Sequence, residues 1–471
     1  MTSAIISREE SIARAATFYA DGRFVAGLRD LVAVRSESQI AGSREELDRY
    51  RRLIAGKLGV IGFACRKFDN PEPAHAGFLL AELREGDDLP TVLIYGHGDV
   101  VPGMEGKWAD GLNPWDVTIV GDKWFGRGTA DNKGQHWTVV SALKCLLDAQ
   151  GKLGFNVKIL LEMGEEVGSP GLHALCRREA QALKADVLLA CDGPRLRADR
   201  PTLFMGARGS VKFTLRARFR ARNYHSGNWG GILKDPVVRL SHAIAAMTDA
   251  NGRLLVEAWR PTKPNAAIKD ALADCDVADD EGGAIDPEWG EPGLSLAERL
   301  YAWNSLTVLA VGAGDIDKPV NAVPGAAVAV CQLRFVVGLD PQAALDSLRA
   351  HLDASGFGDI AIEWDRASDV VATRLDLAHP WVGFVAESIR RTTGRAPQLL
   401  PNLGGALPND CFSEILDLPT IWIPHSYPAC AQHAPNEHAL GSILSEGLRI
   451  MTGVFWDIGN GRLPAMGRIA Q

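Results

Sequence analysis

The sequence predicts an α/β protein with a mostly parallel sheet and an inserted α+β domain. Short apolar runs alternate with helical stretches over residues 20–205. Near Gly209, apolar and polar residues begin to alternate strictly, and the earlier pattern of strand-like and helical segments resumes near Pro380. Strands that alternate with helices are typical of parallel sheets, because parallel strands need long crossover connections. At 471 residues, the chain is long enough for two or three domains.

The first α/β stretch contains apolar runs of strand length separated by longer amphipathic or apolar segments. We predict strands at Thr91–Tyr95, Val157–Glu162, Asp186–Cys191 and, much later, Thr420–Ile423. Helices are expected at Gln135–Asp148 and from Pro170 to Leu183, with Ser169 as the N-cap of the second. Charged residues interrupt the first twenty positions, so this segment reads as an opening helix rather than a signal peptide.

The middle of the chain has a different pattern. From Val211 to Phe219, apolar residues alternate with Lys, Thr and Arg, which predicts a strand with one buried and one solvated face. Further elements are expected at Asp235–Thr248, Leu306–Val311, Ala326–Val336 and Pro341–Leu352, and Asn251–Leu294 is expected to be an irregular lobe. We therefore predict one discontinuous domain over residues 1–207 and 377–471, with an inserted domain over residues 208–376.

Composition excludes several classes of protein. Hydrophobic residues make up 46% and charged residues 23% of the chain, which is typical of a soluble globular enzyme. A net charge of −8 argues against nucleic-acid or anionic-membrane binding, and no apolar run reaches the length of a membrane span. The eight cysteines form no CxxC pair, which favours reduced thiols in a cytoplasmic protein and leaves His and carboxylates as candidate metal ligands.

Polar residues follow the predicted strands. His97 and Asp99 come directly after the first strand and share one face of an extended chain, so the carboxylate can orient a ligating imidazole. A structural histidine is the common alternative for such a pair. Asp131 lies in a glycine-rich loop, where its two oxygens could bridge two cations; a surface turn is the alternative.

Two more acidic clusters occupy equivalent positions. Glu165 and Glu166 follow a second strand, where one can bind a metal while the other stays free as a base; an acidic helix entrance is the alternative. Asp192 ends a third strand, and His433 follows the strand near residue 420. Ligands bind at the carboxyl edge of open α/β sheets, so the joint placement of these residues predicts a metal site.

Competing motifs are weak. The chain has no HExxH, GxSxG or GxxxxGK[ST] sequence. Ser141 and Lys144 match the SxxK of serine acylases, but they lie in an apolar helical run without a KTG partner, and packing explains them better.

Taken together, the motifs resemble those of the M20 metallopeptidases, a family of dipeptidases, carboxypeptidases and deacylases. The resemblance covers nearly the whole chain and rests on HGD at 97–99, GRGTADNKG at 126–134, EMGEEVGS at 162–169, CDGP at 191–194, YHSGNWGG at 224–231, LRF at 333–335, NLGGALP at 402–408 and QHAPNE at 432–437.

The resemblance implies a role for each matching position. Two divalent metals, zinc first with manganese or cobalt as substitutes, would be bridged by Asp131; one would also bind His97 and Asp192, and the other Glu166 and His433. Glu165 would be the general base, and Asp99 would orient His97. The inserted domain would act as a lid and dimerise the chain, so that His225 reaches the partner's active site. Arg334 would bind a substrate carboxylate in a pocket lined by Asn321, Gly404 and Gly405.

Two departures from the family pattern matter. Asn132 replaces a second aspartate, which should be tolerated because Asp131 is the bridge, and Ala406 replaces a serine common in dipeptidases. The expected substrates are dipeptides or small peptides with a free carboxylate, and N-acyl amino acids are the alternative. A non-catalytic protein of the same fold would lack Glu165 or a ligand, and a serine amidase would survive chelation.

Overall fold

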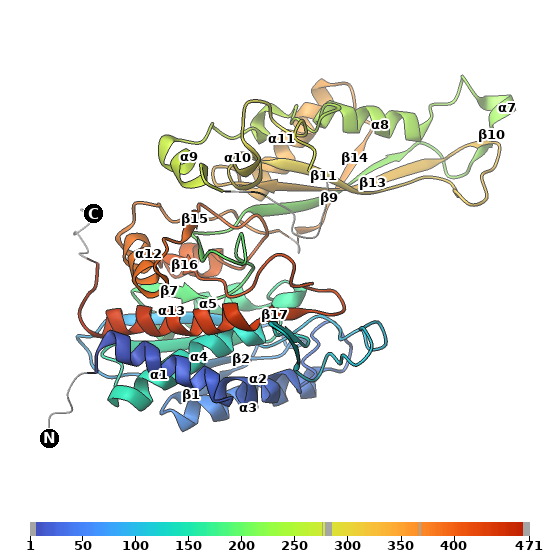
Figure 1. Cartoon of the computed structure of the whole chain (residues 1–471). Coiled ribbons are helices and arrows are strands. Elements are labelled where there is room, and N and C mark those ends of the chain that lie inside the picture. Colours follow the sequence, from blue (N-terminus) through green and yellow to red (C-terminus); the bar gives the residue numbers. More distant parts are fainter. Residues whose placement is uncertain (1–5, 276, 278–284, 367–368, 465–471) are drawn as a thin grey trace.

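The computed structural model describes residues 6–275, 277, 285–366 and 369–464. Its larger part is built on an eight-stranded sheet with helices on both faces (Figure 1). In spatial order, the strands are β1 (Ala64–Phe68), β2 (Phe78–Leu83), β6 (Asn156–Glu162), β3 (Thr91–His97), β7 (Val187–Ala190), β16 (Thr420–Trp422), β8 (Thr202–Phe204) and β15 (Gln398–Leu400).

The centre of this sheet is parallel. Strands β6, β3, β7 and β16 run in one direction, whereas β1 and β2 are antiparallel at one edge and β8 runs against β16 near the other. The predicted α/β fold with a mainly parallel sheet is therefore confirmed, and all four strands predicted for it lie in this central part.

Apolar side chains of the central strands alternate between two buried cores. In β7, Val187 and Leu189 face one core and Leu188 and Ala190 face the other, as expected for a sheet covered on both faces. The first face is covered by α1 (Arg8–Ala20), α2 (Arg23–Val32), α3 (Arg44–Val60), α4 (Lys133–Gln150), α12 (Pro380–Thr393) and α13 (Gly441–Gly459). The second is covered by α5 (Leu172–Arg178), α6 (Ala180–Leu183), α9 (Ala266–Leu272), α10 (Leu296–Tyr301) and a π-helical turn, η4 (Cys411–Ile415).

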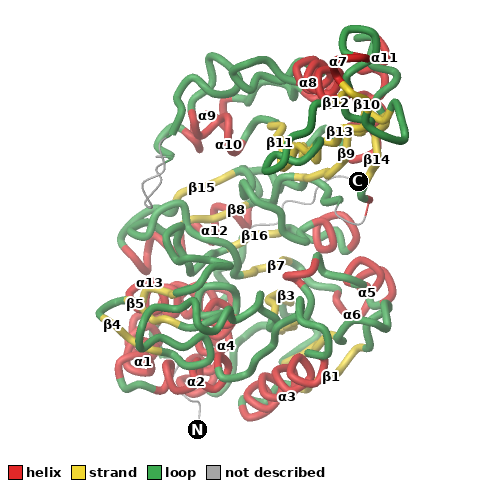
Figure 2. The backbone as a smooth tube through the Cα atoms, turned by 90° about the vertical axis from the view of Figure 1, so that its right-hand side faces the viewer, coloured by secondary structure: helices red, strands yellow, loops and turns green. Residues whose placement is uncertain are grey.

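A smaller four-stranded antiparallel sheet forms the other part of the molecule (Figures 1 and 2). Its strands are β11 (Ser305–Gly312), β13 (Ala326–Phe335), β9 (Gly209–Arg218) and β14 (Ala361–Trp364), and α8 (Pro236–Met247) and α11 (Pro341–Ala354) pack against it. The alternation read from the sequence appears in β9, where Val211, Phe213 and Leu215 are buried and the residues between them are half-buried.

Two small sheets complete the described strands. β10 (Tyr224–His225) and β12 (Ala322–Val323) pair at the far end of the small sheet, next to α7 (Ser226–Trp229). β17 (His438–Leu440), β5 (Lys123–Phe125) and β4 (Thr118–Val120) form a third sheet beside the large one. Within the described ranges, no helix is both long and apolar enough to cross a membrane.

The predicted start of the helix after β6 was wrong. Helix α5 begins at Leu172 with Gly171 as its N-cap, and Ser169 lies outside it with a φ of 51°. The Ser169 hydroxyl donates to the Glu162 carboxylate at 3.0 Å, so it does not cap the helix.

The lobe predicted at Asn251–Leu294 is only partly irregular. It contains the 3-10 turn η2 (Glu257–Trp259) and helix α9, whereas residues 276 and 278–284 lie outside the described part. The Asn265 side chain caps α9 by accepting from the Ile268 N–H, and Ile268 and Leu272 are buried on the large sheet. The surrounding Asp, Gly and Pro residues hid this short helix in the sequence.

The chain crosses between the two parts on two neighbouring segments. The Thr373 N–H donates to the Ala207 carbonyl at 3.0 Å, and Ser210 and Val370 form a β-bridge. At Gly206, where φ is 157°, a Cβ would lie 2.1 Å from the Thr373 carbonyl oxygen, so the close approach of the two segments requires glycine. The two crossovers are therefore hydrogen-bonded to each other as a pair.

Candidate metal centre

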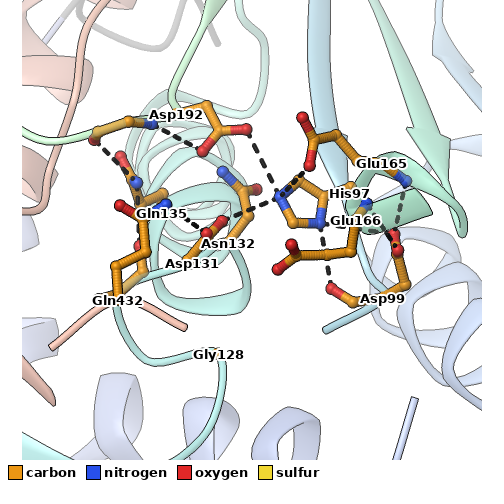
Figure 3. Close-up of polar contacts among 12 residues, drawn as sticks. His97, Asp99, Gly128, Asp131, Asn132, Gln135, Glu165, Glu166, Asp192 and Gln432 are labelled. Atoms are coloured by element: carbon orange, nitrogen blue, oxygen red, sulfur yellow. Dashed lines mark hydrogen bonds and ion pairs between the residues drawn. The ribbon is translucent and has the colours of Figure 1, made fainter. Parts of the chain in front are cut away.

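The acidic clusters predicted from the sequence meet at the carboxyl edge of the large sheet. His97 ends β3, Glu165 opens the 3-10 turn η1 (Glu165–Val167) after β6, and Asp192 follows β7. Figure 3 shows Asp131, Asp192 and Glu165 converging on His97. Because β6, β3 and β7 are parallel neighbours, their ends present these side chains side by side.

Asp131 lies between two histidines. Its Oδ1 is 3.0 Å from His97 Nε2, and its Oδ2 is 3.0 Å from His433 Nε2. The loop that carries Asp131 needs its glycines: Gly128 has a φ of 89°. Each oxygen of the Asp131 carboxylate therefore contacts a different imidazole ring.

Each histidine has a second carboxylate beside it. Asp192 Oδ2 is 3.5 Å from His97 Nε2, and Glu166 Oε2 is 3.0 Å from His433 Nε2. Two groups thus have ligand atoms within 4.8 Å of one another and share Asp131; they are His97, Asp131 and Asp192, and Asp131, Glu166 and His433. Glu165 Oε2 lies 3.9 Å from His97 Nε2, next to these groups.

The cluster holds more negative than positive charge in a buried volume. Burial and the nearby Asp131 raise the pKa of Glu166 to about 7, and burial raises the pKa of Asp192 to about 6 and that of Glu165 well above its usual range. Hydrogen bonds to Asp131 and Glu166 raise the pKa of His433 to about 10. Despite its burial, Asp131 keeps a pKa well below the usual range because both histidines donate to it.

These residues fit a pair of divalent cations. Imidazole nitrogens and carboxylate oxygens are ligands that zinc, manganese and cobalt accept. Glu166 Oε1 is buried and has no hydrogen-bond partner among the described residues, so the cluster retains unused acceptor capacity. The thiol of Cys191, directly before Asp192, contacts the Met451 sulfur at 4.0 Å and does not enlarge the donor set.

Asp99 contacts both His97 and the following turn. The His97 Nδ1–H donates to the Asp99 backbone carbonyl at 3.0 Å, and the nearest Asp99 carboxylate oxygen is 3.5 Å away. The carboxylate accepts the backbone N–H groups of Glu165 and Glu166 at 3.2 and 3.1 Å. Asp99 thus connects the orientation of the imidazole to the position of both glutamates.

Sequence analysis missed Glu437, which holds the Asp131 loop in place. Its Oε1 accepts the backbone N–H groups of Gly128, Ala130 and Asp131 at 3.0 to 3.1 Å, and its Oε2 lies 2.7 Å from Arg127 Nη1. Both side chains of this ion pair are almost fully buried. The QHAPNE motif contained this residue, but nothing in its spacing indicated a contact with backbone N–H groups three hundred positions earlier.

The structure also gives Asn132 a function of its own. Its Nδ2 donates to the Cys191 carbonyl at 2.7 Å, and its Oδ1 lies 3.0 Å from His136 Nδ1. The donor is needed at the end of β7, directly before Asp192, and an aspartate could not supply it.

The predicted carboxylate-binding residues lie where the two parts of the molecule meet. Arg334 is half-buried near the end of β13, and its Nη1 has no hydrogen-bond partner in the described structure. Arg208, which sequence analysis missed, donates to the Arg334 carbonyl at 3.1 Å, and its own backbone N–H donates to the Leu403 carbonyl. Arg208 therefore links the end of β13 that carries Arg334 to Leu403, directly before the Gly404–Gly405 turn.

His225 and Asn321 lie elsewhere. Both are exposed at the β10–β12 tip, where the Ser226 N–H donates to the Asn321 carbonyl at 2.9 Å. Figure 1 shows β10 and α7 at the free end of the small sheet, away from β7 and β16. Asn321 precedes β13 and Arg334 is near its end, so about 30 Å of strand separates them in one chain.

The serine-amidase alternative has no site. Ser141 is fully buried inside α4, and Lys144 pairs with Asp148 at 2.8 Å on the helix surface. The two side chains do not form a nucleophile and base.

The edge cluster contains two candidate metal-binding groups, and comparisons with known proteins name the family and indicate a hydrolytic enzyme. Peptidase family M20/M25/M40 matches residues 93–457. The chain belongs to this family, which confirms the resemblance read from the sequence.

Several relatives are dipeptidases. Beta-Ala-His dipeptidase of Mus musculus is 26% identical over 445 residues, which cover 88% of each chain. A Cys-Gly metallodipeptidase of Candida albicans is 30% identical over 254 residues, which cover 50% of this chain and 51% of the relative. The crystal structure of human carnosine dipeptidase 1 superposes with a TM-score of 0.76 at 23% identity and covers 96% of this chain and 99% of that one, which shows the shared fold.

Proposed function

We propose that this protein is a metallodipeptidase that cleaves the amide bond of dipeptides with a free C-terminal carboxylate. The observation that carries the proposal is Asp131, whose two oxygens each lie 3.0 Å from a different histidine, each with a further carboxylate beside it. Relatives named as dipeptidases support the substrate class, and an N-acyl-amino-acid substrate is the weaker alternative.

The proposed metal ligands form two sets that share Asp131. One set adds His97 and Asp192, and the other adds Glu166 and His433. Zinc suits these donors best, with manganese or cobalt as substitutes. When bound, the two cations supply Lewis acidity and make a water molecule nucleophilic near neutral pH.

The protein side chains do the proton transfer. Glu165 is next to both sets, so it can take the proton of the attacking water and return it to the leaving amine. Burial raises the pKa of Glu165, which favours the return of the proton. Through its three hydrogen bonds, Asp99 fixes the position of the Glu165 backbone relative to the His97 ring.

Substrate selection is assigned to Arg334 and the Gly404–Gly405 turn, where the two parts of the molecule meet. Arg334 offers a fork of donors that matches a carboxylate, and its free Nη1 supports this role. The Gly404–Gly405 turn would line the same pocket from the large domain. We extend the domain division read from the sequence to this scheme: residues 1–207 and 377–471 for catalysis, and residues 208–376 for the lid.

A homodimer would complete the site. His225 and Asn321 lie together at the tip, so a partner's tip could bring both to the metal centre. His225 would then donate to the carbonyl oxygen under attack, and Asn321 would line the pocket. We also propose a cytoplasmic location, which all eight cysteines support because each is a free thiol.

A substrate panel tests the proposal. β-Ala-His and Cys-Gly, their C-terminal amides and matching N-acetyl amino acids would be assayed after chelation and after reconstitution with zinc, cobalt or manganese. We expect no activity in the chelated enzyme, restored cleavage of the free dipeptides and much slower cleavage of the amides. Cleavage of N-acetyl amino acids alone would move the function to the alternative class.

Two arginine variants test the pocket. Arg334→Met should remove the preference for acid over amide, because a hydrogen bond to a charged group contributes about 1.5–3 kcal/mol, or roughly 10- to 150-fold in kcat/KM. Arg216→Met is the control, since Arg216 is on the same sheet but pairs with Glu363 at the surface. Equal discrimination in both variants would remove Arg334 from the pocket.

A further inference from the structure

A second group of metal-binding side chains lies on the opposite face of the large sheet from α4 and α13. His173 and Cys176 are one turn apart on α5, and Asp410 and Cys411 open the π-helical turn packed against it. His173 Nε2 is 2.7 Å from Asp410 Oδ2, and ligand atoms of His173, Asp410 and Cys411 all lie within 4.8 Å of one another. Cys176 and Cys411 are both buried in the core on this side of the sheet.

Ordinary packing accounts for parts of this group but not for the whole. Buried cysteines often act as small apolar side chains, and a His–Asp pair often does no more than join two elements. Here, however, a thiol, an imidazole and a carboxylate from two elements meet at one point, and a second thiol, that of Cys176, is buried in the same core. Imidazole, carboxylate and thiolate are all ligands that zinc accepts, and a fourth ligand completes its tetrahedral geometry. π-helical turns are rare and frequently occur at functional sites.

The geometry is close to that of a bound cation. Ligands about 2.0–2.3 Å from a tetrahedral metal lie roughly 3.3–3.8 Å apart, so the ligand atoms of His173, Asp410 and Cys411, all within 4.8 Å of one another, need to shift by only about 1 Å. Both thiols are fully buried, whereas the His173 side chain is 45% exposed and so leaves a route from solvent.

The charge around the group also favours a cation. Glu162 is buried, and one of its carboxylate oxygens has no hydrogen-bond partner in the described structure; burial raises its pKa to about 7, and a nearby cation would favour its charged form. Burial opposes thiolate formation in the absence of a metal, but a bound cation deprotonates a coordinating thiol.

We propose that His173, Asp410 and Cys411 bind one zinc-like divalent cation as a structural site, separate from the edge cluster, and that Cys176, one turn from His173 on α5, moves in as the fourth ligand. Such a cation would join two segments that flank the active site. Helix α5 closely follows the turn that carries Glu165 and Glu166, and Asp410 closely follows the Gly404–Gly405 turn. The site would therefore fix both segments against each other, and its existence does not depend on the reaction catalysed.

Cobalt titration distinguishes this site from the edge cluster. Thiolate bound to Co²⁺ gives intense charge-transfer absorption in the near ultraviolet, and the edge cluster contains only nitrogen and oxygen donors. Metal-free protein, kept reduced, would be titrated with Co²⁺ while absorption and bound metal are measured. We expect three cobalt ions per chain, one of which produces the thiolate band.

Variants locate the band. Cys411→Ser and Cys176→Ser should each weaken or abolish it, and His173→Ala, a half-exposed position where misfolding is not a concern, should lower the affinity of the band-forming ion at least about tenfold. Cys145→Ser removes a buried thiol in α4 and should leave the band intact, as should Glu166→Gln at the edge cluster.

Two results would overturn the proposal. One is saturation with cobalt and no thiolate band in protein whose eight thiols all titrate as free after denaturation. The other is a Cys176–Cys411 disulfide in protein purified without reductant, with no third metal bound after its reduction. Loss of peptidase activity with the band retained would count against the proposed function alone.

Discussion

The carboxyl edge of the large sheet and the tip of the small sheet differ in how far one chain completes them. At the edge, His97, Asp131 and Asp99 are buried and are held by hydrogen bonds from their own chain. At the tip, His225 and Asn321 are exposed, and their local contacts shape only a short turn. A single chain therefore preassembles its candidate metal ligands but offers its candidate oxyanion donor to another surface.

The largest expected effect concerns the base at the edge. Glu165→Gln should lower kcat by about 10²- to 10⁴-fold with metal content unchanged, because the amide cannot accept the water proton. Glu166→Gln is the matched control: it should instead lose metal at one site, since Glu166 lies 3.0 Å from His433. Metal analysis and kcat on the same samples separate the two. Near-native turnover in both variants would show that the roles are assigned wrongly.

The second prediction compares ion pairs in the two regions. Glu437→Gln should lower the free energy of unfolding by about 3–5 kcal/mol, because it leaves Arg127 charged and unpaired in a buried site. Glu363→Gln breaks the exposed pair with Arg216 on the small sheet and should not measurably change the denaturation midpoint. Denaturant unfolding of the metal-free proteins measures the change in unfolding free energy for each variant. Equal changes in the two variants would show that the buried pair does not stabilise the loop.

The third prediction tests whether the tip serves a partner. His225→Ala should reduce kcat by about 10²- to 10³-fold, the effect of removing one oxyanion donor. Refolding it together with Glu165→Gln should restore about a quarter of wild-type activity, since half of the dimers are mixed and each has one complete site. No rescue in a verified mixed dimer would place His225 outside the partner's site.

The smallest effect concerns His425, which is buried beside α13 with both ring nitrogens unpartnered in the described structure. Burial lowers the pKa of His425 to about 3, whereas the unfolded chain binds a proton near pH 6.5. The unfolded state therefore binds more protons between these values, and stability falls as pH decreases by at most about 1.4 kcal/mol per pH unit. His425→Leu should remove this component. The difference between wild-type and variant unfolding free energies should be constant above pH 6.5 and change below it; a constant difference throughout would refute the assignment.

The same contrast explains how much the sequence could predict. His97, Glu166 and Asp192 could be found because each directly follows an apolar strand, and parallel strands bring their ends together. Glu437 could not be found in this way, because its partners are mainly backbone N–H groups, which have no sequence signature.

Local patterns also failed where elements were short or side chains had other partners. Strands β8 and β15 have three residues each, too few to establish a period. The position of Ser169 in the sequence predicted a helix N-cap, but in the structure its hydroxyl donates to the Glu162 carboxylate. The separation of Asn321 from Arg334 depends on the direction of β13, which the motifs did not contain.

The position of the paired crossover at Ala207 and Thr373 also determines how far a rotation would move each part of the small sheet. The two segments are hydrogen-bonded to each other, so a rotation between the two parts would be a hinge motion about this position. Ten residues of β13 form an arm of about 33 Å, and a turn of about 10° at its base would carry the far end through about 6 Å. Arg334, near the base of the arm, would hardly move during such a rotation, whereas His225, at the far end, would undergo the full displacement.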